Sequence, residues 1–221
     1  VQTPVSAMGM KCLLWVRVPW QPEKLLFRRK KWPDRAGVLQ SVCVQLARWK
    51  ETRMPLAWVS VNLAAQQFQR DDIIPRIVEL IENAGVEGRR LLLEITEGTA
   101  AQDPERVMRT MTALRNHGIR IALDDFGTGY SSMSYLKRFP IDALKIDRSF
   151  VRDLPESQDD AAIASSVIAM SHALGLKVVA EGVETAGQLR HLVDQGCTSG
   201  QGFLFAQPML PASIENWIGL L

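Results

Sequence analysis

The chain has 221 residues, of which 47% are hydrophobic and 23% are charged, and its formal net charge is +2. This composition is typical of a globular domain with a sizeable core, and it excludes a disordered tail, a collagen-like fibre and a disulfide-stapled miniprotein. No apolar run reaches the roughly 18 residues that a membrane-spanning helix needs. The three cysteines, Cys12, Cys43 and Cys197, are odd in number and widely spaced, which favours a reducing compartment.

The charge is unevenly distributed along the chain. The first 50 residues hold ten Lys or Arg against two acids, Glu23 and Asp34, and also four of the six tryptophans. The remaining residues are mildly acidic. The basic, aromatic front and the acidic body therefore need separate explanations.

From residue 38 onward the chain alternates helical and strand patterns. A helix is predicted over 38–50, and short apolar strands are predicted over 56–63, 91–95, 119–123, 143–146, 177–180 and 202–206. Helices are predicted to begin at Asp71-Asp72, Asp103-Pro104, Ser131-Ser132, Asp159-Asp160 and Thr185, and to end at Gly85, Gly118, Pro140, Gly175 and Gly196. Six successive strand–helix units predict an α/β fold with a parallel sheet, closed as an eightfold barrel of the TIM type; an open doubly wound sheet is the alternative.

Polar residues end most of these predicted strands. Because the carboxyl ends of parallel strands meet at one rim, we expect these side chains to converge there. Each has a structural alternative when taken alone, such as starting a turn, capping a helix or pairing with a neighbour. The set comprises Asn62, Glu94, Asp124, Asp125, Lys145, Asp147 and Glu181.

The predicted rim offers carboxylate and amide oxygens and neither His nor Cys. Such donors suit Mg²⁺ or Mn²⁺ rather than zinc. Two such ions a few ångströms apart would clamp the attacking and leaving oxygens of a phosphoryl displacement, with Lys145 orienting or activating water or neutralising charge. The turn around Gly127 and Thr128 is interpreted either as a phosphate-binding loop or as a flexible connection.

Five strings carry a family resemblance: VSVNLAAQQF, LLLEITEG, IALDDFGTGYSSMSYLKRFPIDALKIDRSFVRDL, KVVAEGVET and QGFLFAQPM. Together they resemble the EAL domain, a family of bacterial phosphodiesterases that open cyclic di-GMP to linear pGpG. The resemblance runs from about residue 38 to 221, so we expect one EAL-like domain over 1–221 with a degenerate segment at 1–37. It implies a modified (β/α)₈ barrel whose first one or two units are disrupted.

The resemblance also implies residue roles. Asn62, Glu94, Asp124, Asp125 and Glu181 match metal ligands or their close partners, and Lys145 matches the catalytic lysine, with Asp125 and Glu181 also at the reaction centre. Glu97 matches a glutamate that steadies the loop after Asp125, and Gln201 matches a glutamine on the substrate side. Asp147 matches the aspartate of the KID segment. The segment from Gly127 to Ser132, which includes Thr128, matches the loop that couples the site to the family's dimer interface.

The front of the chain departs from the family pattern. No Glu-Ala-Leu is present, and Lys11-Cys12 stand where its glutamate is expected. Leu26–Trp32 can be encoded so that a one-base shift reads Phe-Val-Ser-Pro-Glu-Glu-Val, close to the family sequence, so we hypothesise a frameshift over 11–37 that the nucleotide sequence would test. A basic arm for nucleic acid or membrane, or plain divergence, are the alternatives.

Three functions follow from the sequence: a cyclic di-GMP phosphodiesterase weakened by the missing glutamate, a binding module without turnover, or a decayed remnant. The resemblance implies Mg²⁺ or Mn²⁺, in two sites, as cofactor and cyclic di-GMP as ligand. It further implies a homodimer, an upstream sensor or GGDEF domain in a longer protein, no DNA or RNA partner, and a bacterial cytoplasmic location, free or within a membrane-anchored protein.

Overall fold

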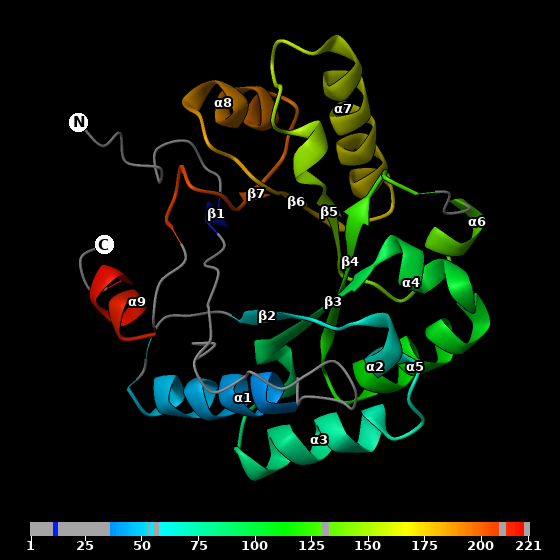
Figure 1. Cartoon of the computed structure of the whole chain (residues 1–221), viewed down its shortest axis with the longest axis vertical. Coiled ribbons are helices and arrows are strands. Elements are labelled where there is room, and N and C mark those ends of the chain that lie inside the picture. The colour runs from blue at the N-terminus through cyan, green and yellow to red at the C-terminus, as the bar shows by residue number, and fades with distance from the viewer. Residues whose placement is uncertain are drawn as a thin grey trace, which may run out of the picture.

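The computed structural model describes residues 11–12, 36–52, 54, 58–129, 133–207 and 211–218. Its centre is a parallel sheet with the strand order β1-β7-β6-β5-β4-β3-β2, and helices lie around it (Figure 1). The strands are β1 (Lys11–Cys12), β2 (Val59–Asn62), β3 (Leu91–Thr96), β4 (Arg120–Phe126), β5 (Ala143–Ile146), β6 (Lys177–Ala180) and β7 (Ser199–Gly200). The predicted α/β fold with a parallel, barrel-type sheet is confirmed.

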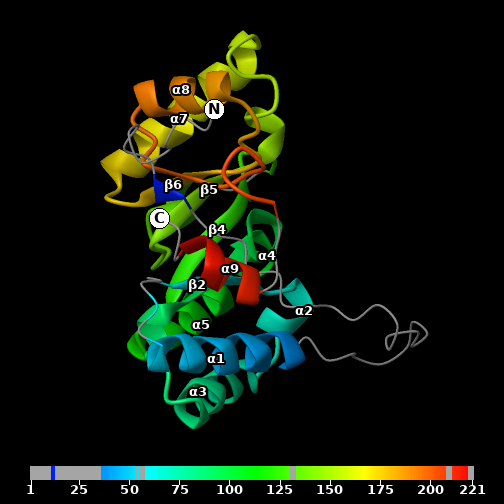
Figure 2. The same cartoon turned by 90° about the vertical axis from the view of Figure 1, so that its left-hand side faces the viewer.

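The helices follow the strands in the predicted alternation. The α-helices are α1 (Ala36–Glu51), α2 (Ala65–Phe68), α3 (Ile73–Asn83), α4 (Glu97–Gln102), α5 (Pro104–Asn116), α6 (Met133–Leu136), α7 (Gln158–Ala173), α8 (Ala186–Asp194) and α9 (Pro211–Ile218), and two 3₁₀ turns are η3 (Gly88–Arg90) and η4 (Arg148–Phe150). Figure 2 shows α7 and α8 at one end of the molecule and α1, α3 and α5 at the other. The helices thus cover the outer face of the curved sheet along its whole length.

Two apolar clusters lie on the two faces of the sheet. The larger joins the outward strand residues to the helices, and it includes Leu93, Leu123 and Leu144, which have no exposed surface. The smaller consists of Leu92, Ala122 and Ala143, with Trp58 packed against them. Because successive strand residues point to opposite faces, the side chains two positions further along β3, β4 and β5 share the face of this smaller cluster.

Two of the predicted helix starts, at Asp103 and Thr185, are confirmed by their capping contacts, while Asp72 precedes α3 as predicted without a side-chain cap hydrogen bond. Asp103 accepts a hydrogen bond from the amide of Arg106 at 3.1 Å at the start of α5, and Thr185 accepts one from Gln188 at 3.2 Å at the start of α8. Helix α7 begins one residue earlier than predicted, because Ser157 rather than an aspartate caps it. The predicted capping residues Ser131 and Ser132 lie outside the described residues.

The prediction of a strand over 202–206 is wrong. The strand in this place is β7, and the chain turns after Gln201, with the amides of Phe205 and Ala206 donating to the carbonyl of Gly202 at 3.1 and 3.3 Å. A Cβ at position 202 would lie 2.1 Å from the Val183 carbonyl oxygen, so only glycine allows this close approach. The apolar GFLF run resembles a buried strand in sequence, but the packing against Val183 bends it.

Helix α1 confirms the helix predicted over 38–50, and it contacts α9, the last described helix. Its buried face comprises Leu39, Val42, Cys43, Leu46 and Trp49. The Trp49 indole donates a hydrogen bond to Glu215 of α9 at 2.8 Å, which ties α9 to α1. None of the helices in the described part of the chain has the length and apolar character needed to cross a membrane.

Most of the degenerate front segment lies outside the described residues. The structure therefore does not test the frameshift hypothesis. Within this segment the structure places Ala36 and Gly37, at the start of α1, and Lys11 and Cys12, which pair as β1 with Ser199 and Gly200 of β7. Lys11 and Cys12 therefore lie in a strand beside β7, which is the last strand in chain order, and neither residue is acidic.

The buried cysteines lead to a first prediction. Burial raises the pKa of the Cys43 and Cys197 thiols to about 11, and the thiolate is the reactive form. In a Cys12→Ser variant at pH 8, we expect both thiols to react with a disulfide reagent about 100-fold or more slowly than free cysteine. The same variant in guanidinium should react rapidly with two equivalents. Fast labelling of the native variant would show that these thiols are exposed.

Candidate functional site

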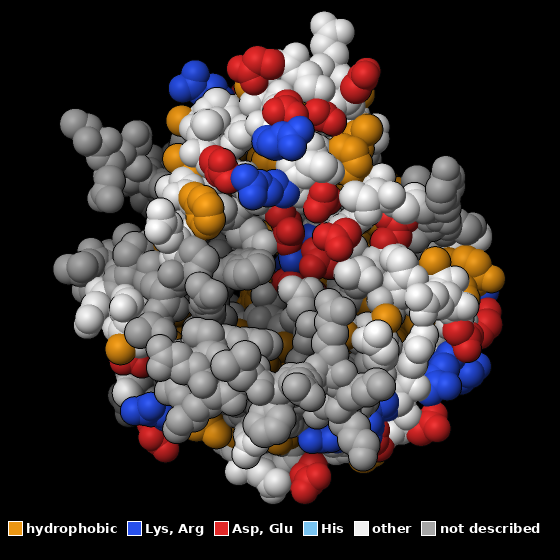
Figure 3. Space-filling view, viewed as in Figure 1, with side chains coloured by type: hydrophobic (Ala, Val, Ile, Leu, Met, Phe, Trp, Pro, Cys, Tyr) orange, Lys and Arg blue, Asp and Glu red, His pale blue; other side chains and the backbone are white. Residues whose placement is uncertain are grey.

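The polar residues at the ends of β3, β4 and β5 share one face of the sheet. Glu94, Asp124 and Lys145 each lie two residues beyond a member of the small inner cluster, so strand alternation turns their side chains to the same side. All three are buried. Figure 3 shows acidic side chains gathered near the middle of the molecular face viewed in Figure 1. The prediction that polar strand ends meet at one rim is confirmed for these strands.

Lys145 lies at the centre of this group. Its ammonium nitrogen is 2.9 Å from Glu94 Oε2 and 2.9 Å from Asp124 Oδ1, and it also contacts Glu181 Oε1. The side chain is 2% exposed. A charge buried this deeply is stable only when opposite charges surround it, and three carboxylates from three neighbouring chain segments do so here.

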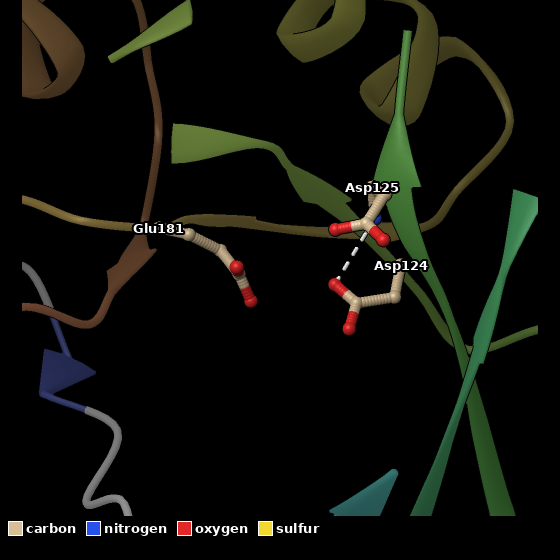
Figure 4. Close-up of side chains that lie close together, drawn as sticks. All are labelled: Asp124, Asp125 and Glu181. Carbon is tan, nitrogen blue, oxygen red and sulfur yellow. Dashed lines mark hydrogen bonds between the residues drawn. The ribbon is translucent and has the colours of Figure 1, made fainter. Parts of the chain in front are cut away.

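Asp124 and Asp125 both reach the site, although adjacent residues of a regular strand point to opposite faces. The pairing of β4 with β5 is irregular between Leu123 and Phe126, and Asp125 has a φ of 55°, which is rare for a residue with a side chain. The Asp125 amide donates to Asp124 Oδ1 at 3.1 Å (Figure 4). This local break in the strand places both carboxylates on the same side.

Three carboxylates converge at this point. Asp124, Asp125 and Glu181 each offer an oxygen, and these oxygens lie within 4.8 Å of one another. Figure 4 shows Glu181 facing the aspartate pair from the segment after β6. Among the described residues this is the one group of three or more acidic, His or Cys side chains with such spacing. Oxygen-only donors at this separation fit a hard divalent cation after small side-chain adjustments.

The electrostatics of the site favour positive charge. Burial raises the pKa of Glu181 to about 7, with the Lys145 ammonium opposing the shift and Asp124 adding to it. Burial also raises the pKa values of Glu94 and Asp125, and the nearby Asp124 carboxylate raises both further. Burial alone would lower the pKa of Lys145, but Glu94, Glu181 and Asp124 outweigh it and raise that pKa. The three carboxylates therefore favour the protonated form of Lys145, which can neutralise charge or orient a ligand.

The remaining predicted residues line the edge of this centre. Gln201 is buried and donates from Nε2 to Glu181 Oε1 at 2.7 Å. Asn62 is exposed at the end of β2, where it is in register with Glu94. Asp147 caps η4 by accepting hydrogen bonds from the amide and hydroxyl of Ser149 at 2.9 and 2.5 Å. Burial would raise the pKa of Asp147, but these hydrogen bonds lower it overall.

Glu97 holds the loop that follows Asp125. Its Oε2 accepts hydrogen bonds from the amides of Gly127 at 3.0 Å and Gly129 at 3.3 Å, while the Thr128 amide and hydroxyl donate to the Asp125 carbonyl at 3.4 and 2.7 Å. The amides of this turn are thus engaged within the chain. The geometry favours a loop fixed by Glu97 over the phosphate-binding interpretation of the Gly127–Gly129 turn.

Two residues beside the site were not singled out by the sequence. Ser60 hydrogen-bonds to Glu94. Strand alternation could have identified Ser60, because it lies two positions before Asn62 and therefore shares the same face of β2. Arg148 follows Asp147, and its side chain lies against Gly182, next to Glu181. No spacing rule connects these two segments, because the contact depends on how the loops fold.

Fold and site together define an α/β barrel-type domain with an acidic, lysine-centred cluster at the carboxyl ends of its parallel strands, whose carboxylates could hold a cation. The profile of the family described as "EAL domain" matches residues 36–208, which is most of the chain. The chain belongs to the EAL domain family.

The chain is similar to, among others, one curated relative and two solved structures. The bifunctional diguanylate cyclase/cyclic di-GMP phosphodiesterase MucR of Pseudomonas aeruginosa is 42% identical over 172 residues, covering 78% of this chain and 25% of MucR. The structure titled PaMucR phosphodiesterase, c-di-GMP complex, is 40% identical with a TM-score of 0.78, covering 80% of this chain and 72% of that chain. The manganese/cy-diGMP complex of Klebsiella pneumoniae BlrP1 is 33% identical with a TM-score of 0.70, covering 78% and 44%. The chain spans about a quarter of the length of the first curated relatives it matches.

Proposed function

We propose that this chain is a divalent-cation-dependent phosphodiesterase domain that hydrolyses cyclic di-GMP to linear pGpG. The observation that carries the proposal is the convergence of Asp124, Asp125 and Glu181 beside a buried, protonated Lys145. Membership of the EAL family, with a relative named a cyclic di-GMP phosphodiesterase, supports the substrate. Such carboxylates can hold the metal ions that stabilise the attacking and leaving oxygens of an in-line displacement at phosphorus. A fixed ammonium can stabilise the charge that develops there.

In this proposal Asp124, Asp125 and Glu181 would hold a Mg²⁺ or Mn²⁺ ion, and Glu94 with Asn62 are the donors available for a second. Such an ion supplies a polarised phosphate and an acidified water when it is bound. Lys145 would neutralise charge that develops on the phosphate oxygens, since its ammonium is already fixed in place by three carboxylates. Gln201 would keep the Glu181 carboxylate oriented.

A second candidate function is a nucleotide-binding module without turnover. The observation that favours it lies at the front of the chain, where the strand β1 beside β7 carries Lys11 and Cys12 rather than a glutamate. The loss of one carboxylate removes a ligand and a negative charge, so cation affinity and activity would fall.

By family resemblance, we also propose that the domain forms a homodimer and that it follows a sensor or GGDEF domain in a longer cytoplasmic protein.

Hydrolysis of cyclic di-GMP by the purified chain tests the proposal. We expect linear pGpG to form with Mg²⁺ or Mn²⁺, to stop with EDTA, and to fall about 1,000-fold or more in Asp124→Asn, because a buried ligand and charge are lost. Asp194→Asn, an exposed residue of α8, is the matched control and should keep full activity. Nucleotide binding by a folded chain that forms no product would support the binding module instead.

A further inference from the structure

The loop that carries Glu181 is contacted from two sides. On one side, the Val183 amide donates to the Gln201 carbonyl at 3.0 Å, and the Leu204 amide donates to the Val183 carbonyl at 3.0 Å. On the other side is the side chain of Arg148. A Cβ at Gly182 would lie 2.3 Å from Arg148 Cγ and 2.8 Å from Cδ, so the arginine stem rests directly on the Gly182 backbone.

The head of Arg148 reaches further along the same loop. Its Nη2 donates to Glu184 Oε1 at 2.8 Å. Both side chains are partly exposed, at 56% and 37%, so water screens the pair and its charge interaction adds little. The stem of a long basic side chain can nevertheless cover backbone while its head stays in water. The contact with Gly182 is therefore the part of Arg148 that fixes the loop.

A second connection joins the two segments a few residues away. Buried Gln188 accepts hydrogen bonds from the amides of Glu184 and Thr185 at 2.7 and 2.9 Å and donates to the Arg152 carbonyl at 2.8 Å. The segment that begins with η4 and the loop after β6 are thus fastened at two points. Of the two, Arg148 is the one adjacent to Glu181.

We propose that Arg148 is a positioning residue, whose aliphatic stem presses on Gly182 and so fixes the Glu181 carboxylate where it can bind a divalent cation. The inference rests on the proposed function, since it assigns Glu181 to the cation site. Gly182 has a φ of 69° and no side chain, so it adds no side-chain packing of its own beside Glu181. The hydrogen bonds of Val183 and the contacts of Glu181 with Lys145 and Gln201 hold the loop from the other side, so without the stem we expect the loop and its carboxylate to be less precisely fixed.

Mn²⁺ affinity, measured by electron paramagnetic resonance on the full chain, tests this role without turnover. We expect Arg148→Ala to weaken Mn²⁺ binding about tenfold, as the loss of a supporting group around a metal ligand does. Arg148→Met keeps a stem over Gly182 without charge and should stay within about twofold of the parent chain. Arg152→Ala is the matched control, because that side chain pairs with neighbouring Asp153 at 2.8 Å.

Amide exchange gives a second measurement that needs no metal. The amides of Val183 and Glu184 should exchange faster in Arg148→Ala and stay protected in Arg148→Met and Arg152→Ala. If Arg148 instead contacts the nucleotide, nucleotide affinity will fall in both Arg148 variants while Mn²⁺ affinity and exchange are unchanged, and the proposal is overturned. A chain that binds Mn²⁺ but forms no pGpG would remove the proposed function and leave this inference standing. Should the chain bind no Mn²⁺, faster exchange in Arg148→Ala would support only the fixing of the loop, and unchanged exchange would overturn the inference.

Discussion

Replacing Lys145 with Met should be the most damaging single substitution in this domain. Met matches the length of the lysine stem but removes the ammonium, so Glu94, Asp124 and Glu181 are left facing one another with no positive charge between them. Removing one partner of a buried ion pair costs about 3–5 kcal/mol of unfolding free energy. For a domain of this size we expect the melting temperature to fall by about 10 °C in metal-free buffer.

The loss should depend on both metal and pH. A divalent cation would supply the missing positive charge, so Mn²⁺ should raise the melting temperature of Lys145→Met by more than it raises that of the parent chain. The Lys145 ammonium lowers the pKa values of Glu94 and Glu181, so without it these two values rise further and both groups take up protons as the pH falls. The destabilisation should therefore be smaller at pH 5 than at pH 8. Activity should drop about 1,000-fold even with Mn²⁺ present.

The matched control is Lys177→Met, because Lys177 is exposed at the start of β6. That variant should melt within a few degrees of the parent chain. If Lys145→Met does not fold in metal-free buffer, refolding with and without Mn²⁺ decides the point. A Lys145→Met chain that is as stable as the parent without metal would show that the lysine does not neutralise the carboxylates.

The order of elements was predictable from the sequence because each strand–helix unit carries its own local signals. Apolar runs such as Leu91–Ile95 and helix caps such as Thr185 depend on neighbouring residues alone, and the structure places them as expected. The position of the rim was also predictable, because the residues at the carboxyl ends of parallel strands lie at one edge of the sheet.

The details that the sequence could not predict all depend on contacts between segments distant along the chain. The turn after Gln201 exists because Gly202 packs on Val183, and no local pattern in GFLF reveals this. The shared orientation of Asp124 and Asp125 requires a break in the β4–β5 register, whereas the sequence shows only an unbroken apolar strand that ends in two acids. The meeting of polar strand ends was therefore predictable, but the local backbone that brings Asp124 and Asp125 to the same side was not.

The backbone geometry at Asp125 can be tested directly by replacing Glu97. The Glu97 carboxylate is buried and accepts the amides of Gly127 and Gly129, which belong to the loop directly after Asp125. Asp125 itself has a left-handed backbone conformation, and such a conformation persists only where the surroundings hold it. The carboxylate of Glu97 is one of these restraints, because it prevents the loop from relaxing away from the site.

Replacing Glu97 with Ala leaves both amides without this acceptor. Hydrogen bonds to a charged group contribute about 1.5–3 kcal/mol each, so the loop should lose its fixed position while the strands around it stay folded. We expect Mn²⁺ affinity to fall about tenfold, as Asp125 is no longer held, and turnover of cyclic di-GMP to fall about 100-fold. Glu97→Gln keeps one oxygen that can accept these amides, so it should lie between the alanine variant and the parent chain.

Glu105→Ala separates this effect from a general loss of negative charge. Glu105 pairs with Arg138 at 3.0 Å on the surface, where both side chains are about half exposed, and its removal should change neither Mn²⁺ affinity nor turnover. Mn²⁺ titration and pGpG formation would be measured side by side for the three variants and the parent chain. Equal Mn²⁺ affinity in Glu97→Ala and Glu105→Ala would mean that Asp125 keeps its place without the Glu97 carboxylate. The irregular end of β4 would then be sufficient to hold the cation site by itself.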